Sequence, residues 1–373
     1  MIKVLSIFGT RPEAIKMAPV IKELASRQQI ESVVCVSAQH REMLDQVLAA
    51  FSITPDYDLN LMQPNQTLSM ITSRVQEGLE KVIIEVQPDI VLVHGDTTTA
   101  MAASLASFYQ QKTVGHVEAG LRTFDKYSPF PEEINRQIID CIADMLFAPT
   151  DLSKQNLIST KNHRQEIFVT GNTAIDALAT TVSENYHNPI FDWVGQDRLI
   201  LITAHRRENL GNPMRGIFRA IQRVLDEFPD VKAVYPVHLN PKVQAVAKEI
   251  FQDSSRIKLI DPLEVVDFHN FMKKSHIILT DSGGVQEEAP SLGKPVLVLR
   301  DTTERPEGVT AGTLKLVGTD ESSVYRETKN LLVDDELYKK MATAKNPYGD
   351  GKASKRIVDA IIDRFSSPSA RAS

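Results

Sequence analysis

Cysteine is scarce in this sequence, which contains only Cys35 and Cys141, and neither belongs to a C-x-x-C pair. This count argues against a disulfide framework or a cysteine-based metal site, and it predicts two buried thiols in a reducing compartment. No run of residues is long and apolar enough to span a membrane. The formal net charge of −6 also leaves no general basic surface for binding nucleic acid through its phosphates. We therefore expect neither a membrane nor a nucleic acid among the partners.

Motifs for common nucleotide cofactors and for export are missing as well. No G-x-G-x-x-G follows the first apolar run, and Gly293-Lys294 lacks both the upstream glycine and the following Ser or Thr of a P-loop. Nicotinamide redox chemistry and NTP hydrolysis are therefore disfavoured. The N-terminus lacks the charged region, apolar stretch and cleavage site of a signal peptide, which predicts cytoplasmic residence.

The composition that is present is that of an ordinary globular protein, with 42% hydrophobic and 24% charged residues. The length of 373 residues exceeds the size at which a single hydrophobic core usually stops growing. Two domains are therefore expected, with one large barrel as the alternative.

Short runs rich in Val and Ile alternate with stretches of helical periodicity, a pattern typical of parallel sheets covered by helices on both faces. The predicted strands lie at residues 3–8, 32–36, 90–93, 113–117, 145–147 and 167–169, and in a second series at 199–203, 233–235, 257–259, 277–279, 295–299 and 314–317. The periodicity lapses at 184–197, and the Ser/Ala-rich tail at 366–373 is expected to fray. The fold class is therefore α/β, with two doubly wound domains.

Charged and imidazole side chains cluster directly after several of these strands. The clusters lie at residues 9–13, 94–96, 116–118, 204–208 and 281–284. Open α/β sheets bind ligands beyond the carboxyl ends of their strands, so we expect these clusters to converge on one site in an interdomain cleft.

The first cluster carries two signals. Thr10 and Glu13 fit a capping box at the start of a helix. Arg11 and Lys16 then lie where the helix dipole disfavours positive charge, so we interpret them as ligands of a bound anion.

The segment DSGG at 281–284 joins a predicted strand to a predicted helix. Small residues and backbone N–H groups at a helix start form a phosphate site, although tight turns also use glycine for its freedom at positive φ. Glu287 and Glu288 in the next turn either offset the helix dipole or accept the two hydroxyl groups of a ribose. The spacing leaves both interpretations open.

Two strand ends place an imidazole and a carboxylate on the same face, His94 with Asp96 and His116 with Glu118. This geometry is compatible with a metal site, but a strand-end histidine more often only satisfies hydrogen bonds, so we predict no metal. Asp96, Glu118 and Glu132 are better candidates for acid/base groups, although Glu132 also fits the start of a helix.

Taken in order, these segments resemble the bacterial non-hydrolysing UDP-N-acetylglucosamine 2-epimerases. The matching motifs run from the first strand to about residue 362, and they are GTRPEAIK (9–16), HGDTTT (94–99), HVEAGLR (116–122), AHRRE (204–208), PVHLNP (236–241) and NPYGDG (346–351), with residues 280–294 and 300–307. Long motifs in a fixed order are far more specific than one glycine-rich loop.

The resemblance implies a glycosyltransferase-B type fold, in which two Rossmann-like doubly wound domains face a central cleft. Residues 1–188 would carry the acid/base carboxylates, 189–350 would bind UDP, and a helix at 351–365 would cross back to the first domain. The resemblance also implies a homodimer that needs no NAD, metal or other cofactor.

The implied activity is reversible epimerisation at C2, which interconverts UDP-N-acetylglucosamine and UDP-N-acetylmannosamine. UDP would be eliminated to give a 2-acetamidoglucal and then added back, in the service of surface polysaccharide synthesis. The alternatives are a hydrolysing 2-epimerase and a UDP-sugar glycosyltransferase of the same fold. A catalytically idle sensor should have lost one of Asp96, Glu118 and Glu132, and all three are present.

The resemblance also assigns roles to individual residues. Asp96, Glu118 and Glu132 match the acid/base positions. The other matching residues are Lys16 and His205 in the catalytic set, Arg11, Ser282, Gly283, Gly284 and Arg305 around the nucleotide and its phosphates, Glu288 at the ribose and Phe268 beside the uracil.

Many bacterial members bind a second UDP-N-acetylglucosamine as an activator, near the segment that matches Gln39, His40 and Glu42. In this chain Glu42 stands where some relatives have Gln, and Asn65 where some have Arg. An added carboxylate and a lost cation would weaken the binding of a diphosphate, so we expect activation to be weak.

Overall fold

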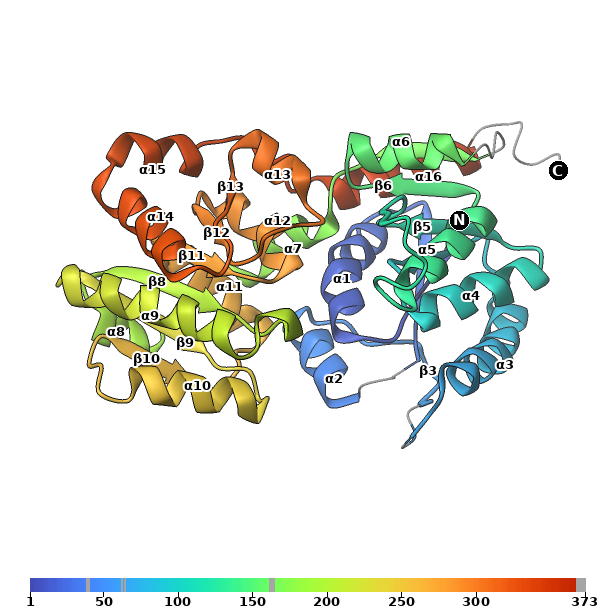
Figure 1. Ribbon diagram of the computed structural model, residues 1–373. Coiled ribbons are helices and arrows are strands. Elements are labelled where there is room, and N and C mark those ends of the chain that lie inside the picture. The colour runs from blue at the N-terminus through green and yellow to red at the C-terminus, as the bar shows by residue number, and fades with distance from the viewer. Residues whose placement is uncertain (38–40, 62, 64, 161–164, 367–373) are drawn as a thin grey trace. The chain divides into compact units, whose positions relative to one another are not determined.

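The computed structural model describes residues 1–37, 41–61, 63, 65–160 and 165–366 of the chain (Figure 1). The chain divides into two compact units, of which unit 1 comprises Met1–Thr180 and Tyr348–Ser373 and unit 2 comprises Thr181–Pro347. Unit 2 is thus inserted into the sequence of unit 1. Across the described residues, no helix is both long and apolar enough to cross a membrane. The tail predicted to fray lies outside these residues, except for Ser366.

Unit 1 is built on a parallel sheet of seven strands in the order β3-β2-β1-β4-β5-β6-β7. Its strands are β1 (Ile2–Phe8), β2 (Ile30–Val36), β3 (Tyr57–Asp58), β4 (Ile90–His94), β5 (Thr113–Val117), β6 (Met145–Ala148) and β7 (Glu166–Val169). The central strand β4 is buried along its whole length, as expected where helices cover both faces of a sheet. Its Val and Ile side chains suit this environment because β-branched residues pack well on a pleated surface.

The helices of unit 1 alternate with these strands along the chain. They are α1 (Arg11–Ala25), α2 (Arg41–Ala50), α3 (Leu68–Val86), α4 (Thr98–Tyr109), α5 (Glu132–Ile142), α6 (Asp151–Ser159), α7 (Thr173–Thr181) and α16 (Ala353–Ser366). Helix α16 lies in the second stretch of unit 1 and packs against α1, where Arg27 forms an ion pair with Asp359 at 2.8 Å.

Unit 2 has a parallel sheet of six strands in the order β10-β9-β8-β11-β12-β13. Its strands are β8 (Arg198–Thr203), β9 (Val231–Pro236), β10 (Ile257–Ile260), β11 (Ile277–Thr280), β12 (Val296–Val298) and β13 (Leu314–Leu316). Its helices are α8 (Pro189–Val194), η1 (Arg207–Asn209), α9 (Asn212–Glu227), α10 (Pro241–Phe251), α11 (Val265–Lys274), α12 (Gly283–Glu288), η2 (Ala289–Leu292), α13 (Pro306–Ala311), α14 (Glu321–Val333) and α15 (Asp335–Ala342).

Each sheet has one point at which the strand order reverses. In unit 1 the chain leaves β1 for β2 on one side and later returns to β4 on the other, and in unit 2 the strands β8 and β11 have the same relationship. Loops diverge at such a switch point and leave a crevice beyond the carboxyl ends of the two strands, where ligands bind in doubly wound folds. The residues that follow β1, β4, β8 and β11 therefore lie where a ligand is expected to bind.

The prediction of two doubly wound α/β units is confirmed, and so are the twelve predicted strands to within two residues at each end. The capping box is confirmed as well, because Thr10 caps α1 while Glu13 accepts the backbone N–H of Thr10 at 2.8 Å. The two-residue strand β3 was not predicted, since it is too short to show a pattern. The prediction of two buried thiols is wrong for Cys141, which lies on the exposed face of α5, while burial raises the pKa of Cys35 to about 12.

Candidate functional site

Glu118 follows β5 and has a left-handed backbone, with φ at 68°. Its carboxylate is largely buried and forms an ion pair with the ammonium group of Lys16, which lies in the second turn of α1. Asn172 donates a hydrogen bond to the same oxygen, Oε2, at 3.0 Å. His94 Nε2 lies 3.8 Å from that oxygen. Strained backbone of this kind clusters at functional sites, which makes Glu118 a strong candidate for a functional residue.

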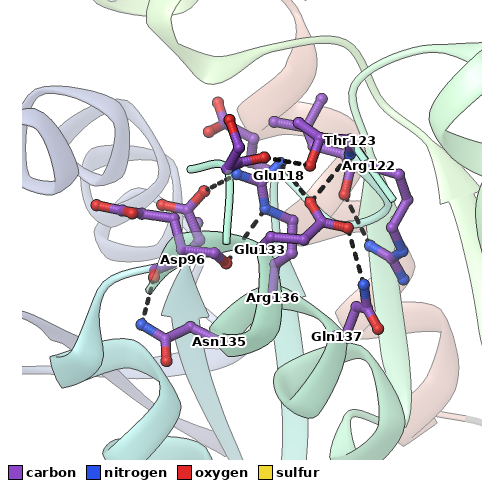
Figure 2. Close-up of polar contacts among 12 residues, drawn as sticks. Asp96, Glu118, Arg122, Thr123, Glu133, Asn135, Arg136 and Gln137 are labelled. Carbon is purple, nitrogen blue, oxygen red and sulfur yellow. Dashed lines mark hydrogen bonds and ion pairs between the residues drawn. The ribbon is translucent and has the colours of Figure 1, made fainter. Parts of the chain in front are cut away.

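Asp96 lies in the turn after β4 and pairs with Arg136 of α5 at 2.7 Å (Figure 2). Burial raises the pKa of the Asp96 carboxyl group; the charge of Arg136 opposes this rise, and the charges of Glu118 and Glu132 add to it. The amide of Asn135 donates to the backbone carbonyl of Asp96 at 2.9 Å and so fixes the turn. A carboxyl group whose pKa is raised holds a proton more readily, as a proton-donating catalyst must.

Two adjacent glutamates begin α5 and lie in different environments. Glu132 is half-buried, and its charge contributes to the raised pKa of Asp96. Glu133 is fully buried and accepts the backbone N–H groups of Thr123 and Phe124 at 3.0 and 3.2 Å (Figure 2). Glu133 therefore anchors the loop before α5, whereas Glu132 belongs electrostatically with Asp96.

His94 and His116, the two histidines at strand ends, lie in different environments. Burial lowers the pKa of His94 to about 3, so this imidazole is neutral at physiological pH. His116 lies between Asp140 and the carbonyl of Gly95, at 2.6 and 2.7 Å, and Asp140 also pairs with Arg122 at 2.6 Å. His116 thus supports the backbone beside Asp96. Within the described parts of the chain, no group of three or more His, Cys, Asp or Glu side chains could hold a metal ion.

In unit 2, Asp281 follows β11 and is fully buried. Its Oδ2 accepts the backbone N–H groups of His205 and Arg206, both at 2.8 Å, and the amide of Asn209 at 3.0 Å. Burial alone would raise the pKa of Asp281, but the hydrogen bond and charge of His205, with the backbone N–H groups, outweigh it and lower the pKa. The His205 ring is partly exposed and stacks on His238 with centroids 5.6 Å apart. Asp281 therefore fixes the loop that presents His205.

The start of α12 meets the guanidinium group of Arg305. A Cβ added at Gly283 would lie 3.5 Å from Arg305 Nη2, so the guanidinium group lies within van der Waals contact of this position. Arg305 also forms an ion pair with the buried Glu287. Ser282 precedes α12, and within the described structure its side chain makes no capping hydrogen bond to the helix. A helix start beside a guanidinium group suits a phosphate.

Glu288 ends α12 and lies close to the buried His269. His269 Nε2 is 3.4 Å from Glu288 Oε2, and its Nδ1 lies 2.6 Å from the hydroxyl group of Thr181. The neighbouring Phe268 is half-buried on α11. The carboxylate of Glu288 thus lies beside the imidazole of His269, whereas the carboxylate of Glu287 pairs with Arg305.

The candidates fall into two groups according to the unit in which they lie. The group of unit 1 contains Arg11 at the first position of α1, Lys16, Asp96, Glu118 and Glu132, and the group of unit 2 contains His205, Phe268, Ser282, Gly283, Gly284, Glu288 and Arg305. Of the residues assigned to an activator, Gln39 and His40 lie outside the described residues, and Glu42 lies in α2 without a described side chain.

Sequence reasoning missed three side chains of the unit 1 group. Arg136 lies four residues after Glu132 in the same helix, a spacing that would have placed both on one face. Asn172 follows β7, so the rule for strand ends could have found it. Asp140 gives no such signal, because it lies inside α5 and reaches His116 only through tertiary packing.

Comparison with known proteins adds a family to this geometry. A family model described as UDP-N-acetylglucosamine 2-epimerase matches residues 22–362. The UDP-N-acetylglucosamine 2-epimerase of Bacillus subtilis is 63% identical over 98% of this chain and 96% of its own length. A crystal structure of the Neisseria meningitidis enzyme bound to UDP-GlcNAc is 51% identical, covers 97% of this chain and 100% of that one, and has a TM-score of 0.86. The structure of the enzyme from Methanocaldococcus jannaschii is 34% identical with the same coverage and a TM-score of 0.85.

Proposed function

The chain belongs to the UDP-N-acetylglucosamine 2-epimerase family, and from this premise we propose that it inverts C2 of UDP-N-acetylglucosamine by reversible elimination of UDP. The family resemblance found in the motifs is thereby confirmed. The product is UDP-N-acetylmannosamine. The paired carboxylates and cations of unit 1, Glu118 with Lys16 and Asp96 with Arg136, are the observation that carries the mechanism.

Direct deprotonation at C2 would be very slow because no adjacent carbonyl group makes the C2 hydrogen acidic. Elimination of UDP avoids this difficulty. A carboxylate removes the C2 proton, the C1–C2 double bond forms, and the electrons of the C1–O bond leave with the diphosphate. The intermediates are UDP and 2-acetamidoglucal. A diphosphate oxygen then attacks C1 again while an acid delivers a proton to the opposite face of C2, so two acid/base groups are needed.

Asp96, Glu118 and Glu132 are the proposed acid/base groups. The raised pKa of Asp96 supports a role as proton donor, because burial favours its protonated form. Glu118 lies beside an ammonium group, which favours its charged form as a base. Deuterium exchange at C2 in variants of these carboxylates would assign each one to a face of the sugar ring.

The nucleotide is assigned to the group of unit 2. Negative charge develops on the diphosphate as the C1–O bond breaks, and cations with N–H dipoles stabilise it. Arg305, the start of α12 and His205 supply such groups in unit 2. Glu288 would accept the ribose hydroxyl groups, and Phe268 would lie beside the uracil.

We further propose that the protein is a cytoplasmic homodimer whose product enters surface polysaccharide synthesis. Phe108 and Tyr109 at the end of α4 support dimerisation, because their side chains are 58% and 64% exposed and would lose this apolar exposure in an interface. Light scattering of the protein, with Phe108→Ser as the comparison, tests the dimer.

Proton NMR in D₂O with UDP-N-acetylglucosamine, after chelation and without NAD, tests the proposed reaction. The expected result is UDP-N-acetylmannosamine that carries deuterium at C2. Free N-acetylmannosamine with UDP would instead identify a hydrolysing enzyme. An unchanged spectrum would contradict the epimerase mechanism and favour a transferase that needs an acceptor. Repeating the exchange with Asp96→Asn, Glu118→Gln and Glu132→Gln shows which face of the sugar each carboxylate serves.

A further inference from the structure

Asn172 lies between β7 and α7, is 3% exposed, and connects three parts of unit 1. Its side-chain amide donates to Glu118 Oε2 at 3.0 Å, and its Oδ1 accepts the backbone N–H of Ala174 at 2.9 Å. Its own backbone N–H donates to the carbonyl of Tyr348 at 2.7 Å. One residue therefore joins the start of α7, the segment that returns from unit 2 and the carboxylate of Glu118.

The choice of asparagine at this position reflects Glu118. Asp, Asn and Ser serve about equally well where a side-chain oxygen must accept a backbone N–H at a helix start. Of these, only asparagine also presents an N–H donor from the end of the side chain toward a carboxylate. The capping function alone would accept aspartate, whereas the contact with Glu118 requires the amide.

Glu118 needs such support because its backbone is held at φ 68°, a conformation that non-glycine residues seldom adopt and that persists only where the surroundings enforce it. Lys16 and Asn172 both contact Oε2. The lysine side chain is long and flexible, but Asn172 is short and is fixed by its backbone. The amide is therefore the contact that can define the carboxylate's position.

The backbone next to Asn172 is fixed by close packing of two chain segments, one at Gly171 and one at Gly349. Gly171 has φ +90°, and a Cβ added there would lie 3.2 Å from Gly349 Cα. A Cβ added at Gly349 would in turn lie 3.4 Å from the backbone nitrogen of Asn172. Tyr348 beside it is 3% exposed. The loop of Asn172 is thus tied to the point where the chain returns to unit 1.

We propose that Asn172 is a positioning residue for Glu118, and that it transmits the position of the returning segment at Tyr348 to that carboxylate. This inference rests on the proposed function, in which Glu118 is an acid/base group. Asn172 touches no reacting atom in this scheme and acts by fixing the direction of the Glu118 side chain.

Asn172→Asp tests the proposal because it keeps the oxygen that accepts the Ala174 N–H and replaces only the donor. We expect kcat to fall about 10- to 100-fold while KM changes little, because small misplacements of a catalytic group cost about that much. The new carboxylate faces Glu118 and raises its pKa, so the acidic limb of the kcat profile should move to higher pH. Asn188→Asp is the matched control, since Asn188 makes the same kind of cap, to Ile190, in unit 2.

The loss of kcat caused by Asn172→Asp should vanish when the side chain at position 118 is already neutral. In a Glu118→Gln background, Asn172→Asp should cause no further loss of kcat, whereas a purely structural role would lower both enzymes equally. An unchanged kcat and an unchanged acidic limb in the single variant would overturn the proposal.

A spectroscopic measurement covers the case in which the variant does not fold. The side-chain amide ¹H–¹⁵N signals of Asn172 in the otherwise native enzyme should shift between wild type and Glu118→Gln, and should follow the titration of Glu118. Signals that are the same in both proteins would refute the contact. If the wild type does not exchange the C2 proton, the proposed function fails, while these signals still test the link between Asn172 and Glu118.

Discussion

Arg136 and Asp96 form an ion pair at the edge of the unit 1 group, with Arg136 Nη2 2.7 Å from Asp96 Oδ2. The Arg136 side chain is 10% exposed and the Asp96 side chain 29%. This pairing opposes the effect of burial, which raises the pKa of Asp96. Arg136 therefore limits how far the proton affinity of Asp96 rises.

Replacing Arg136 with Met should raise the pKa of Asp96 further, because the opposing charge is removed while the burial remains. The proton-donating step proposed for Asp96 should then persist to a higher pH than in the wild type. We therefore expect the limb of the kcat profile that reports Asp96 to move to higher pH. A kcat–pH profile measures this, and Arg364→Met, which removes the surface pair with Glu166, should leave the profile unchanged.

The adjacent glutamates of α5 should respond in opposite ways to the same substitution. Glu132→Gln should lower kcat by about 10²- to 10⁴-fold, the usual contribution of an acid/base group, with little change in stability. Glu133→Gln should lower the free energy of unfolding by about 1–3 kcal/mol, because the Gln amide cannot accept both N–H groups of Thr123 and Phe124 as the carboxylate does. Urea unfolding and turnover assays on both variants check this; equal effects of the two would contradict the assignment.

The stability lost in Glu133→Gln should itself depend on pH. Burial would raise the pKa of Glu133, but its hydrogen bonds outweigh burial and lower the pKa in the folded state. The stabilisation is therefore complete above the unfolded value of 4.5 and is lost as pH falls through the lower folded value. Unfolding curves measured from pH 7 down to pH 3 should converge for wild type and variant at the acidic end.

Asp281→Asn should weaken UDP binding and destabilise unit 2. Asp281 Oδ2 receives three donors, and the loss of its charge weakens each of these hydrogen bonds. We expect the affinity for UDP to fall about 10-fold, because a difference of about 1.4 kcal/mol in placing the His205 loop is a factor of ten. Titration calorimetry with UDP measures it, and Asp230→Asn at the surface pair with Arg198 is the control. Unaltered affinity would show that the loop does not depend on this carboxylate.

His276 lies outside the candidate site, and its titration should affect the stability of unit 2 at acidic pH. Its ring stacks on Tyr338 with centroids 4.2 Å apart, and burial lowers its pKa to about 4. The unfolded chain takes up a proton near pH 6.5 while the folded chain resists until about pH 4, so stability falls as pH decreases through this window. His276→Phe keeps an aromatic ring against Tyr338 and removes the titration. The decline in unfolding free energy between pH 6.5 and 4 should therefore be shallower in the variant than in the wild type.

Strands and strand-end residues were predictable because both depend on local pattern. Runs of β-branched residues mark the buried strands, and the residues directly after β4 and β5 must lie at one edge of the sheet. Asp96 and Glu118 could be found in this way. The left-handed backbone of Glu118 could not, because it arises from contacts with segments far away in the sequence.

Partner residues were harder to predict because they come from other elements. Glu118 meets Asn172 across 54 positions of sequence and Lys16 across 102. The exposure of Cys141 shows a related limit, since a helix of mixed polarity does not reveal from local sequence alone which of its small residues faces outward. Tertiary packing decides such cases.

The insertion of unit 2 also determines the order in which the protein can be completed during synthesis. Helix α1 is translated early, but α16, which packs on it and buries Ile357, Val358 and Ile361, is translated only after the whole of unit 2. The first stretch of unit 1 therefore remains with the α16-facing side of α1 uncovered while the ribosome synthesises unit 2. The final layer of unit 1 is added after translation has passed residue 347, so its two stretches meet only after unit 2 has been synthesised.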